Sequence, residues 1–205
     1  MVDFPVSAGE CALLIHDIGE GLRTPGKRLY DPTGASVIAS IAKLADFCRA
    51  KNLPFFYAVV GDYRPPPGVV TRYDNMAAMD DETRKIPPEI APRDGDTVFV
   101  KYKSGAFIDT PVEAKMRELG KRTLIICGST LQYGVETACR DAANRDFRVL
   151  LVGDCIRVRE IKDCGWGDVT PDEIRKVVFS SLSQVYAKVV TLQQLKAMLS
   201  EQPCA

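Results

Sequence analysis

The chain has no excess of charge of either sign and no apolar run long enough to cross a membrane. Its 205 residues include 27 lysines and arginines and 27 aspartates and glutamates, so the formal net charge is zero. A balanced chain has no general attraction for nucleic acid or for an anionic lipid surface, and we expect neither partner. A membrane helix needs about 20 consecutive apolar residues, and no run approaches that length. No basic segment followed by an apolar one opens the chain, which predicts no secretory leader and a cytoplasmic location.

Paired cysteines are lacking as well. The chain has seven cysteines, an odd number, and no two of them stand in a CxxC pair. A disulfide framework or a zinc site is built from regularly spaced cysteines, so the sequence favours neither. Four of the cysteines lie within or beside apolar segments: Cys11, Cys48, Cys127 and Cys155. We interpret these as reduced, buried thiols of a protein in a reducing compartment.

What the sequence does contain is an alternation of short apolar runs and longer helical patterns. Strands are predicted at residues 11–16, 54–60, 97–102, 123–127, 149–152 and 188–191. Helices are predicted at residues 36–51, 110–119, 135–145, 170–186 and 192–200. Strands that are apolar throughout belong to parallel sheets covered on both faces. The sequence therefore predicts one α/β domain over residues 1–205: a three-layer, doubly wound (Rossmann-like) sheet of about six mainly parallel strands with helices on both faces.

Two helix starts and one long connection stand out locally. Thr110 and Thr170 are each followed by proline and, three residues on, by glutamate, which predicts a capping box at both. Residues 61–96 are rich in proline and show little strand or helix pattern. A connection of that length in a compact domain is typical of a lid or a binding loop.

Polar residues gather where three predicted strands end. Asp17 follows the first strand, Lys101 ends the third, and a turn bracketed by glycines, residues 128–134, joins the fourth strand to a helix. Ligands of doubly wound folds bind beyond the carboxyl ends of the strands. Taken singly, an aspartate or lysine at such a place is more often a turn residue or a solvated one. The turn is more informative, because backbone N–H groups at a helix N-terminus suit an anion.

Three stretches resemble the motifs of the isochorismatase-like (cysteine hydrolase) superfamily: ALLIHDI, KYKSGAF and CGSTLQYGVETACRDAANRDFRVLLVGDC. The resemblance implies that Asp17 is the catalytic aspartate and Lys101 the catalytic lysine. In most of that family the turn ends in a nucleophilic cysteine, whose position is Gly134 here. Cys127 lies inside the preceding strand and Cys139 on the body of the following helix, so neither replaces it. Attack by a thiolate on an amide is therefore not expected at this site.

One branch of the family also has glycine at this position, namely the isochorismatases, which cleave a vinyl ether. That branch tends to have His-Asp in the first motif, as His16 and Asp17 do here. The resemblance implies that Asp17 protonates the vinyl carbon, that water adds, and that pyruvate and a dihydroxy-diene acid result. Asp17 must then carry a proton near neutral pH, and Lys101 holds a carboxylate or orients the acid. On a regular strand His16 points away from Asp17, which predicts a packing role for the histidine.

The substrate predicted from these motifs is a small carboxylate. Candidate binding residues are Ser129, Thr130, Gln132, Tyr133, Lys103 and Arg23, with Arg64 and Arg72 as further loop candidates. We expect no cofactor. Zinc-binding amidases of the family have Asp-x-His after the second strand, and residues 62–64 lack the histidine, so we expect no catalytic metal. The resemblance also implies a non-proline cis peptide at Ser129–Thr130 and a homo-oligomer, either dimer or tetramer.

Three functions remain open on this basis. The first is isochorismatase-type hydrolysis. The second is other acid–base chemistry by Asp17 and Lys101, such as isomerisation, elimination or ring closure. The third is a catalytically inactive member kept for binding or assembly. A Gly134→Cys substitution is expected to place a reactive thiol beside Asp17 and Lys101.

Overall fold

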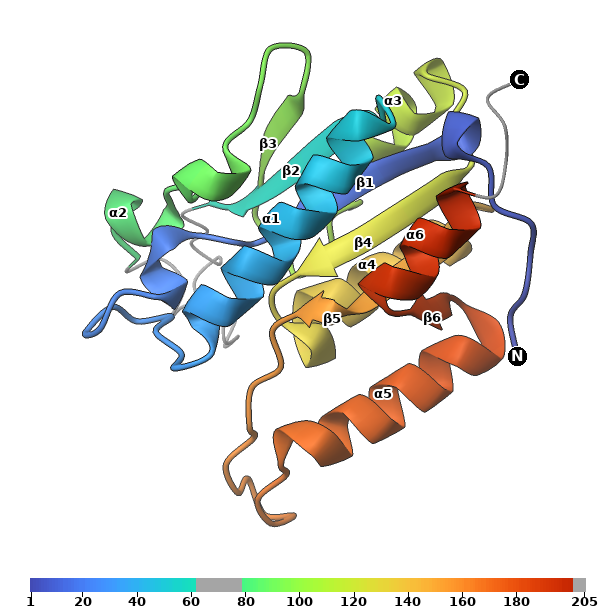
Figure 1. The fold of residues 1–205 in the computed structure, drawn as a ribbon. Helices are drawn as coiled ribbons and strands as arrows, with labels where there is room; N and C mark the ends of the chain where they lie inside the picture. The colour runs from blue at the N-terminus through green and yellow to red at the C-terminus, as the bar shows by residue number, and fades with distance from the viewer. Residues whose placement is uncertain (62–78, 201–205) are drawn as a thin grey trace.

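The computed structural model describes residues 1–61 and 79–200, and its centre is a parallel sheet (Figure 1). Six strands run in the order β3-β2-β1-β4-β5-β6, and every neighbouring pair is parallel. Their bounds are β1 Cys11–His16, β2 Phe55–Val60, β3 Thr97–Lys101, β4 Thr123–Gly128, β5 Arg148–Ile156 and β6 Lys188–Val190. The first three strands extend the sheet in one direction and the last three in the other. The chain therefore reverses its strand order between β1 and β4, where doubly wound folds bind their ligands.

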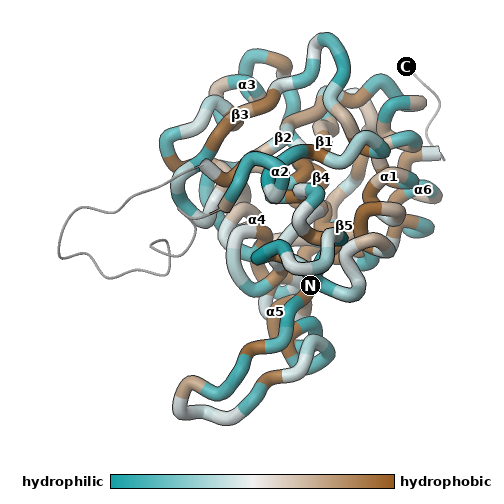
Figure 2. The backbone as a smooth tube through the Cα atoms, turned by 90° about the vertical axis from the view of Figure 1, so that its left-hand side faces the viewer, coloured by the Kyte–Doolittle hydropathy of each residue, from teal (hydrophilic) through white to brown (hydrophobic). Residues whose placement is uncertain are grey.

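Helices cover both faces of the sheet, as the apolar strands predicted. The longer helices are α1 Gly34–Ala50, α3 Val112–Glu118, α4 Glu136–Ala143, α5 Pro171–Val185 and α6 Leu192–Ser200. Apolar side chains of α1 and α6 pack with Leu13 and Ile15 of β1 in one core, while those of α3, α4 and α5 pack with Leu14 in the other. Figure 2 shows the apolar segments concentrated along the strands in the interior. The predicted three-layer α/β fold is confirmed.

Local predictions at the helix starts had mixed outcomes. Thr170 forms the predicted capping box with Glu173 at the start of α5. At α3 the prediction is wrong: the N-cap is Pro111, no side chain caps the helix, and the Thr110 hydroxyl donates instead to the carbonyl of Ala106. A threonine hydroxyl can bond backward to a carbonyl as readily as forward to an N–H, and the loop before α3 offers it such an acceptor.

The long connection after β2 has some structure of its own. Residues 79–96 contain a short helix, α2 Asp81–Arg84, and a 3-10 turn, η4 Pro88–Ile90. Residues 62–78, which include Asp62, Arg64 and Arg72, lie outside the described residues. None of the helices in the described ranges is both long and apolar enough to span a membrane.

Candidate active site

Asp17 and Lys101 meet at the carboxyl edge of the sheet. The Lys101 Nζ atom lies 2.7 Å from Oδ2 of Asp17, although β2 separates the strands that carry the two residues. Asp17 follows β1 with a left-handed backbone (φ 49°), which turns its side chain over the end of the strand. Lys101 is only 2% exposed, and its long side chain reaches past the end of β2. The two residues singled out from the sequence are therefore in contact.

Every proton of the Lys101 ammonium group has a hydrogen-bond acceptor. Besides Asp17, Nζ donates to the carbonyls of Lys103 (3.0 Å) and Ser104 (3.2 Å). Three acceptors match the three N–H donors of an ammonium, so the geometry suits the charged form. A buried charge is tolerated only when it is paired and hydrogen-bonded, and both conditions hold here. Lys101 is consequently a fixed positive charge against one oxygen of Asp17.

His16 belongs to this site, contrary to the prediction that its side chain points away from Asp17. Its Nδ1 lies 3.4 Å from Oδ2 of Asp17, and the ring contacts the carbonyls of Ser129 (Nδ1, 3.0 Å) and Ser104 (Nε2, 3.1 Å). Strand alternation fails because Asp17 leaves the extended conformation. The imidazole is fully buried. That burial lowers its pKa to about 4, with Lys101 also lowering it and Asp17 opposing the shift, so the ring is neutral at neutral pH.

The turn after β4 is an irregular helix start rather than a simple loop. Ser129–Thr130 is a non-proline cis peptide, as the resemblance implied. A π-helical turn, η5 Leu131–Val135, follows and leads into α4. Short π-helical segments are frequent at functional sites. Gly134 lies within this turn, and a Cβ atom there would come within 2.3 Å of His16 Cε1 and 2.8 Å of the Ser104 carbonyl oxygen. A cysteine at this position therefore does not fit the present side-chain arrangement, which corrects the expectation for Gly134→Cys.

A cavity of about 410 Å³ opens onto the acid–amine pair, a size typical of small-molecule sites. Of the predicted residues, the structure brings Asp17, Lys101, Lys103, Ser129, Thr130, Tyr133 and Gly134 to its wall. Gln132 and Arg23 are not among the lining residues. The Gln132 amide donates to the carbonyl of Arg159 instead. Arg23 is held by Glu20 (2.6 and 2.7 Å) and Glu89, which neutralise its charge.

Three arginines that the sequence analysis missed also line the cavity: Arg28, Arg157 and Arg159. Arg157 is 3% exposed, pairs with Asp31 at 2.9 Å and lies 3.5 Å from Oγ1 of Thr130. Arg157 and Arg159 follow directly on β5, so the strand-end rule that selected Asp17 and Lys101 would have found them too. Arg28 carries no such signal, because it lies in an irregular segment before α1. Among the described residues of the wall, five cationic side chains face one carboxylate.

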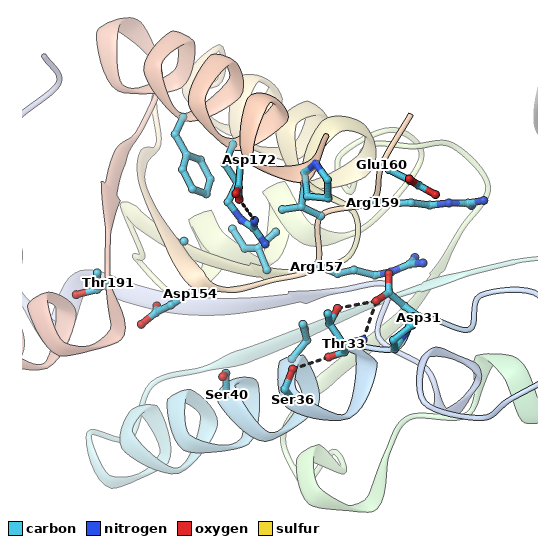
Figure 3. Close-up of a pocket in the computed structure, with 18 of the residues that line it drawn as sticks. Asp31, Thr33, Ser36, Ser40, Asp154, Arg157, Arg159, Glu160, Asp172 and Thr191 are labelled. Carbon is cyan, nitrogen blue, oxygen red and sulfur yellow. Dashed lines mark hydrogen bonds and ion pairs between the residues drawn. The ribbon is translucent and has the colours of Figure 1, made fainter. Parts of the chain in front are cut away.

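A larger cavity, about 1110 Å³, lies beside the first between the starts of α1 and α5 (Figure 3). It shares Arg28, Arg157 and Arg159 with the smaller cavity but contains neither Asp17 nor Lys101. The figure shows Arg157 and Asp31 paired at one end of it and Asp154 and Thr191 at the other. The two candidate catalytic residues thus line the smaller cavity and not the larger one.

None of the described cysteines lines the smaller cavity. Cys127 is fully buried in the core on the α1 side of the sheet and Cys139 in the core on the α4 side, and burial raises the pKa of both thiols. A buried thiol with a raised pKa is a poor nucleophile, because the thiolate is the reactive form. Within residues 1–61 and 79–200, no three histidine, cysteine, aspartate or glutamate side chains are grouped as metal ligands would be.

The class that the fold and site define is a doubly wound α/β protein with an ion pair, Asp17–Lys101, at the carboxyl edge of its sheet, where such folds bind ligands. The chain belongs to the isochorismatase family, because the Isochorismatase domain model matches residues 11–194.

Known relatives agree with this assignment. Enterobactin synthase component B of Escherichia coli is 30% identical over 159 residues, which are 76% of this chain and 55% of the relative. The chain thus spans only about half of the length of that relative. Phenazine biosynthesis protein PhzD1 of Pseudomonas aeruginosa is 26% identical over 153 residues, 70% of each chain. A cysteine hydrolase from Pseudomonas syringae pv. phaseolicola has the same fold, with a TM-score of 0.87 and 20% identity over 97% of this chain and 96% of that one.

Proposed function

We propose that the protein hydrolyses a small carboxylate-bearing vinyl ether in the manner of an isochorismatase, with Asp17 as general acid and Lys101 as its partner. The observation that carries the proposal is the 2.7 Å contact between the two side chains in a cavity whose described wall contains no sulfur. Proton transfer needs such a pair, and nucleophilic attack by a thiolate needs a cysteine that this wall does not provide.

The two oxygens of Asp17 are in different situations. Oδ2 accepts from Lys101, whereas Oδ1 is buried and has no hydrogen-bond partner among the described residues. A buried oxygen without a donor is better protonated than charged. We therefore assign the transferred proton to Oδ1, while Lys101 fixes the orientation of the carboxyl group through Oδ2.

The proposed reaction begins when the substrate enters with its carboxylates among the cationic side chains. The proposed mechanism requires the protonated form of Asp17 in the complex with the substrate. Asp17 then gives its proton to the vinyl carbon and an oxocarbenium ion forms. Water adds to that ion and gives a hemiketal. The bond between the hemiketal carbon and the ether oxygen then breaks, so that pyruvate forms and the ether oxygen becomes a hydroxyl group of the dihydroxy-diene acid. Asp17 regains a proton in the last step.

The charge of the wall supports an anionic substrate. Lys103, Arg28 and Arg159 line the cavity beside Lys101 and the buried Arg157. Arginine binds carboxylates through two parallel N–H groups. Ser129 and Thr130 lie on the same wall, and their hydroxyls are 2.9 Å apart, near enough to bind one ligand group together.

The test is release of pyruvate from isochorismate by the purified protein. Asp17→Asn keeps the size of the side chain but cannot supply the proton, and we expect kcat to fall at least about 1000-fold. Asp109→Asn is the matched control, because Asp109 also has a left-handed backbone (φ 55°) but lies outside the cavity; it should keep wild-type activity. Pyruvate release by Asp17→Asn at the wild-type rate would overturn the assignment.

A further inference from the structure

The space beside Gly134 is occupied by the side chain of His16. A Cβ atom on residue 134 would lie 2.3 Å from Cε1 and 3.0 Å from Nε2 of the imidazole. Non-bonded carbon atoms attract best at about 3.5–4.0 Å, so the ring and a side chain at position 134 exclude each other. The ring cannot move aside easily, because it is fully buried and both of its nitrogens contact backbone carbonyls.

Those two carbonyls belong to the two loops that build the site. Ser129 lies in the turn after β4, and Ser104 lies in the loop after β3 whose carbonyl also accepts from Lys101. The imidazole therefore spans from one loop to the other beneath the acid–amine pair. The charged side chains that face it are Asp17, 3.4 Å from Nδ1, and Lys101, which shares the Ser104 carbonyl with Nε2.

We propose that His16 is a positioning residue: its imidazole fills the volume left by Gly134 and joins the β3 and β4 loops, and this holds the Asp17 carboxyl group against Lys101. The catalytic consequence rests on the proposed function, whereas the structural coupling between positions 16 and 134 does not. The glycine at 134 is on this account required by the imidazole of His16 together with the Ser104 carbonyl that the imidazole contacts.

The protonation of the ring fits this arrangement. Burial keeps the imidazole neutral, so it has one N–H for two carbonyls. Asp17 lies 3.4 Å from Nδ1 and opposes the lowering of the ring pKa. The state of His16 is thereby linked to the state of Asp17.

The first test is a cycle of variants measured by thermal unfolding. Gly134→Ala should lower Tm by about 5 °C in the wild-type background, because overpacking a filled site destabilises the fold. In a His16→Asn background the same change should cost clearly less, because the contacts with the imidazole are gone and only the contact of the Cβ atom with the Ser104 carbonyl oxygen, at 2.8 Å, is left. Gly9→Ala is the control: its Cβ would meet only Ser7 at 3.9 Å, so it should behave alike in both backgrounds. Equal losses from Gly134→Ala in both backgrounds would overturn the coupling.

The second test needs no change at position 16. His16 is the only histidine of the chain, so protein labelled with ¹⁵N-histidine gives one pair of ring signals. We expect a neutral ring that does not titrate between about pH 5.5 and 8, against an ordinary histidine value near 6.5. Asp17→Asn should shift both signals, which a histidine with a packing role alone would not show. A ring that titrates near pH 6.5, or signals unchanged in Asp17→Asn, would contradict the proposal.

The third test separates this inference from the proposed function. The variant His16→Asn/Gly134→Ala, if folded as the first test expects, should lower kcat for isochorismate about 10- to 100-fold and leave KM nearly unchanged, since the binding side chains are intact. An unchanged kcat would overturn the positioning role. If the wild-type protein does not turn over isochorismate, the proposed function fails, and the unfolding cycle and the ring signals still decide the role of His16.

Discussion

The two neighbouring cavities differ in more than size. The larger one, about 1110 Å³, is lined by two ion pairs, Asp172 with Arg175 at 2.8 Å and Asp31 with Arg157 at 2.9 Å. The smaller one, about 410 Å³, is lined by the buried Lys101 and by Asp17, one of whose oxygens has no hydrogen-bond partner among the described residues, and the neutral His16 contacts Asp17 from outside the lining. Groups held in costly states are typical of sites that do chemistry. By this comparison the smaller cavity is the better candidate for the active site, on the state of its polar groups and not on its volume.

A substitution of Lys101 should have the largest effect and is the strongest test of the difference between the two cavities. Lys101→Met removes the charge but keeps the length of the side chain, so Asp17 and two loop carbonyls lose their donor. We expect kcat to fall about 100-fold or more. Breaking a buried ion pair costs about 3–5 kcal/mol, and we expect the free energy of unfolding to fall by a value near the lower end of that range, because Asp17 keeps some solvent contact. Steady-state assays and urea unfolding measure the two effects.

The matched variant in the larger cavity is Arg175→Met, because Arg175 is an exposed cation paired with a single exposed aspartate. It should leave kcat unchanged and alter stability by less than about 1 kcal/mol. If the two substitutions have equal effects on activity, the distinction between the cavities is wrong.

Arg159 allows a smaller test of which cavity binds the substrate. It lines both cavities, follows β5 and is exposed. Arg159→Ala should raise KM about 10-fold with little change in kcat, because a charge-assisted hydrogen bond to a carboxylate contributes about 1.5–3 kcal/mol. Arg175→Ala, which changes only the larger cavity, should not alter KM. A rise in KM for Arg175→Ala but not for Arg159→Ala would place the substrate in the larger cavity.

Asp31 gives the smallest effect, on stability and its dependence on pH. Burial would raise the pKa of this carboxyl, but hydrogen bonds from Thr33 and Arg157 outweigh burial and lower it. A carboxyl whose pKa is lower in the folded protein stabilises the fold above its unfolded value of about 3.9, and this contribution is lost as the pH falls towards the folded value. Asp31→Asn should therefore lower Tm by a few degrees at pH 7, and the difference should shrink as the pH falls below about 4 towards the folded pKa. A Tm difference that is constant from pH 7 to pH 3 would contradict this account.

The sequence predicted the fold and the meeting of Asp17 with Lys101 well, because both follow from short-range patterns. Apolar strands without alternation predicted the parallel sheet, and their ends placed Asp17 and Lys101 at one edge. The predictions failed where a contact depends on distant parts of the chain. Arg23 was predicted to bind the substrate, but its guanidinium group is bound by Glu89, which lies 66 residues away in the sequence.

The predicted direction of the His16 side chain was wrong for a different reason, whereas the predicted packing role agrees with the full burial of the ring. Strand alternation assigns a side chain to one face only while the backbone stays extended. Asp17 has a left-handed backbone, so its side chain does not point to the face opposite His16. The steric conflict between His16 and residue 134 joins positions more than a hundred residues apart, and no local pattern indicates it.

The most direct test of the central claim, proton transfer to the vinyl carbon with no thiol attack, is hydrolysis of isochorismate in H₂¹⁸O followed by mass spectrometry of the dihydroxy-diene acid. Protonation by Asp17 directs water to the future pyruvate carbonyl, so the ring keeps its own oxygen and we predict no change in the mass of the diene acid. A diene acid that carries one ¹⁸O atom would show that water attacks the ring carbon, and it would contradict the mechanism assigned to Asp17 and Lys101.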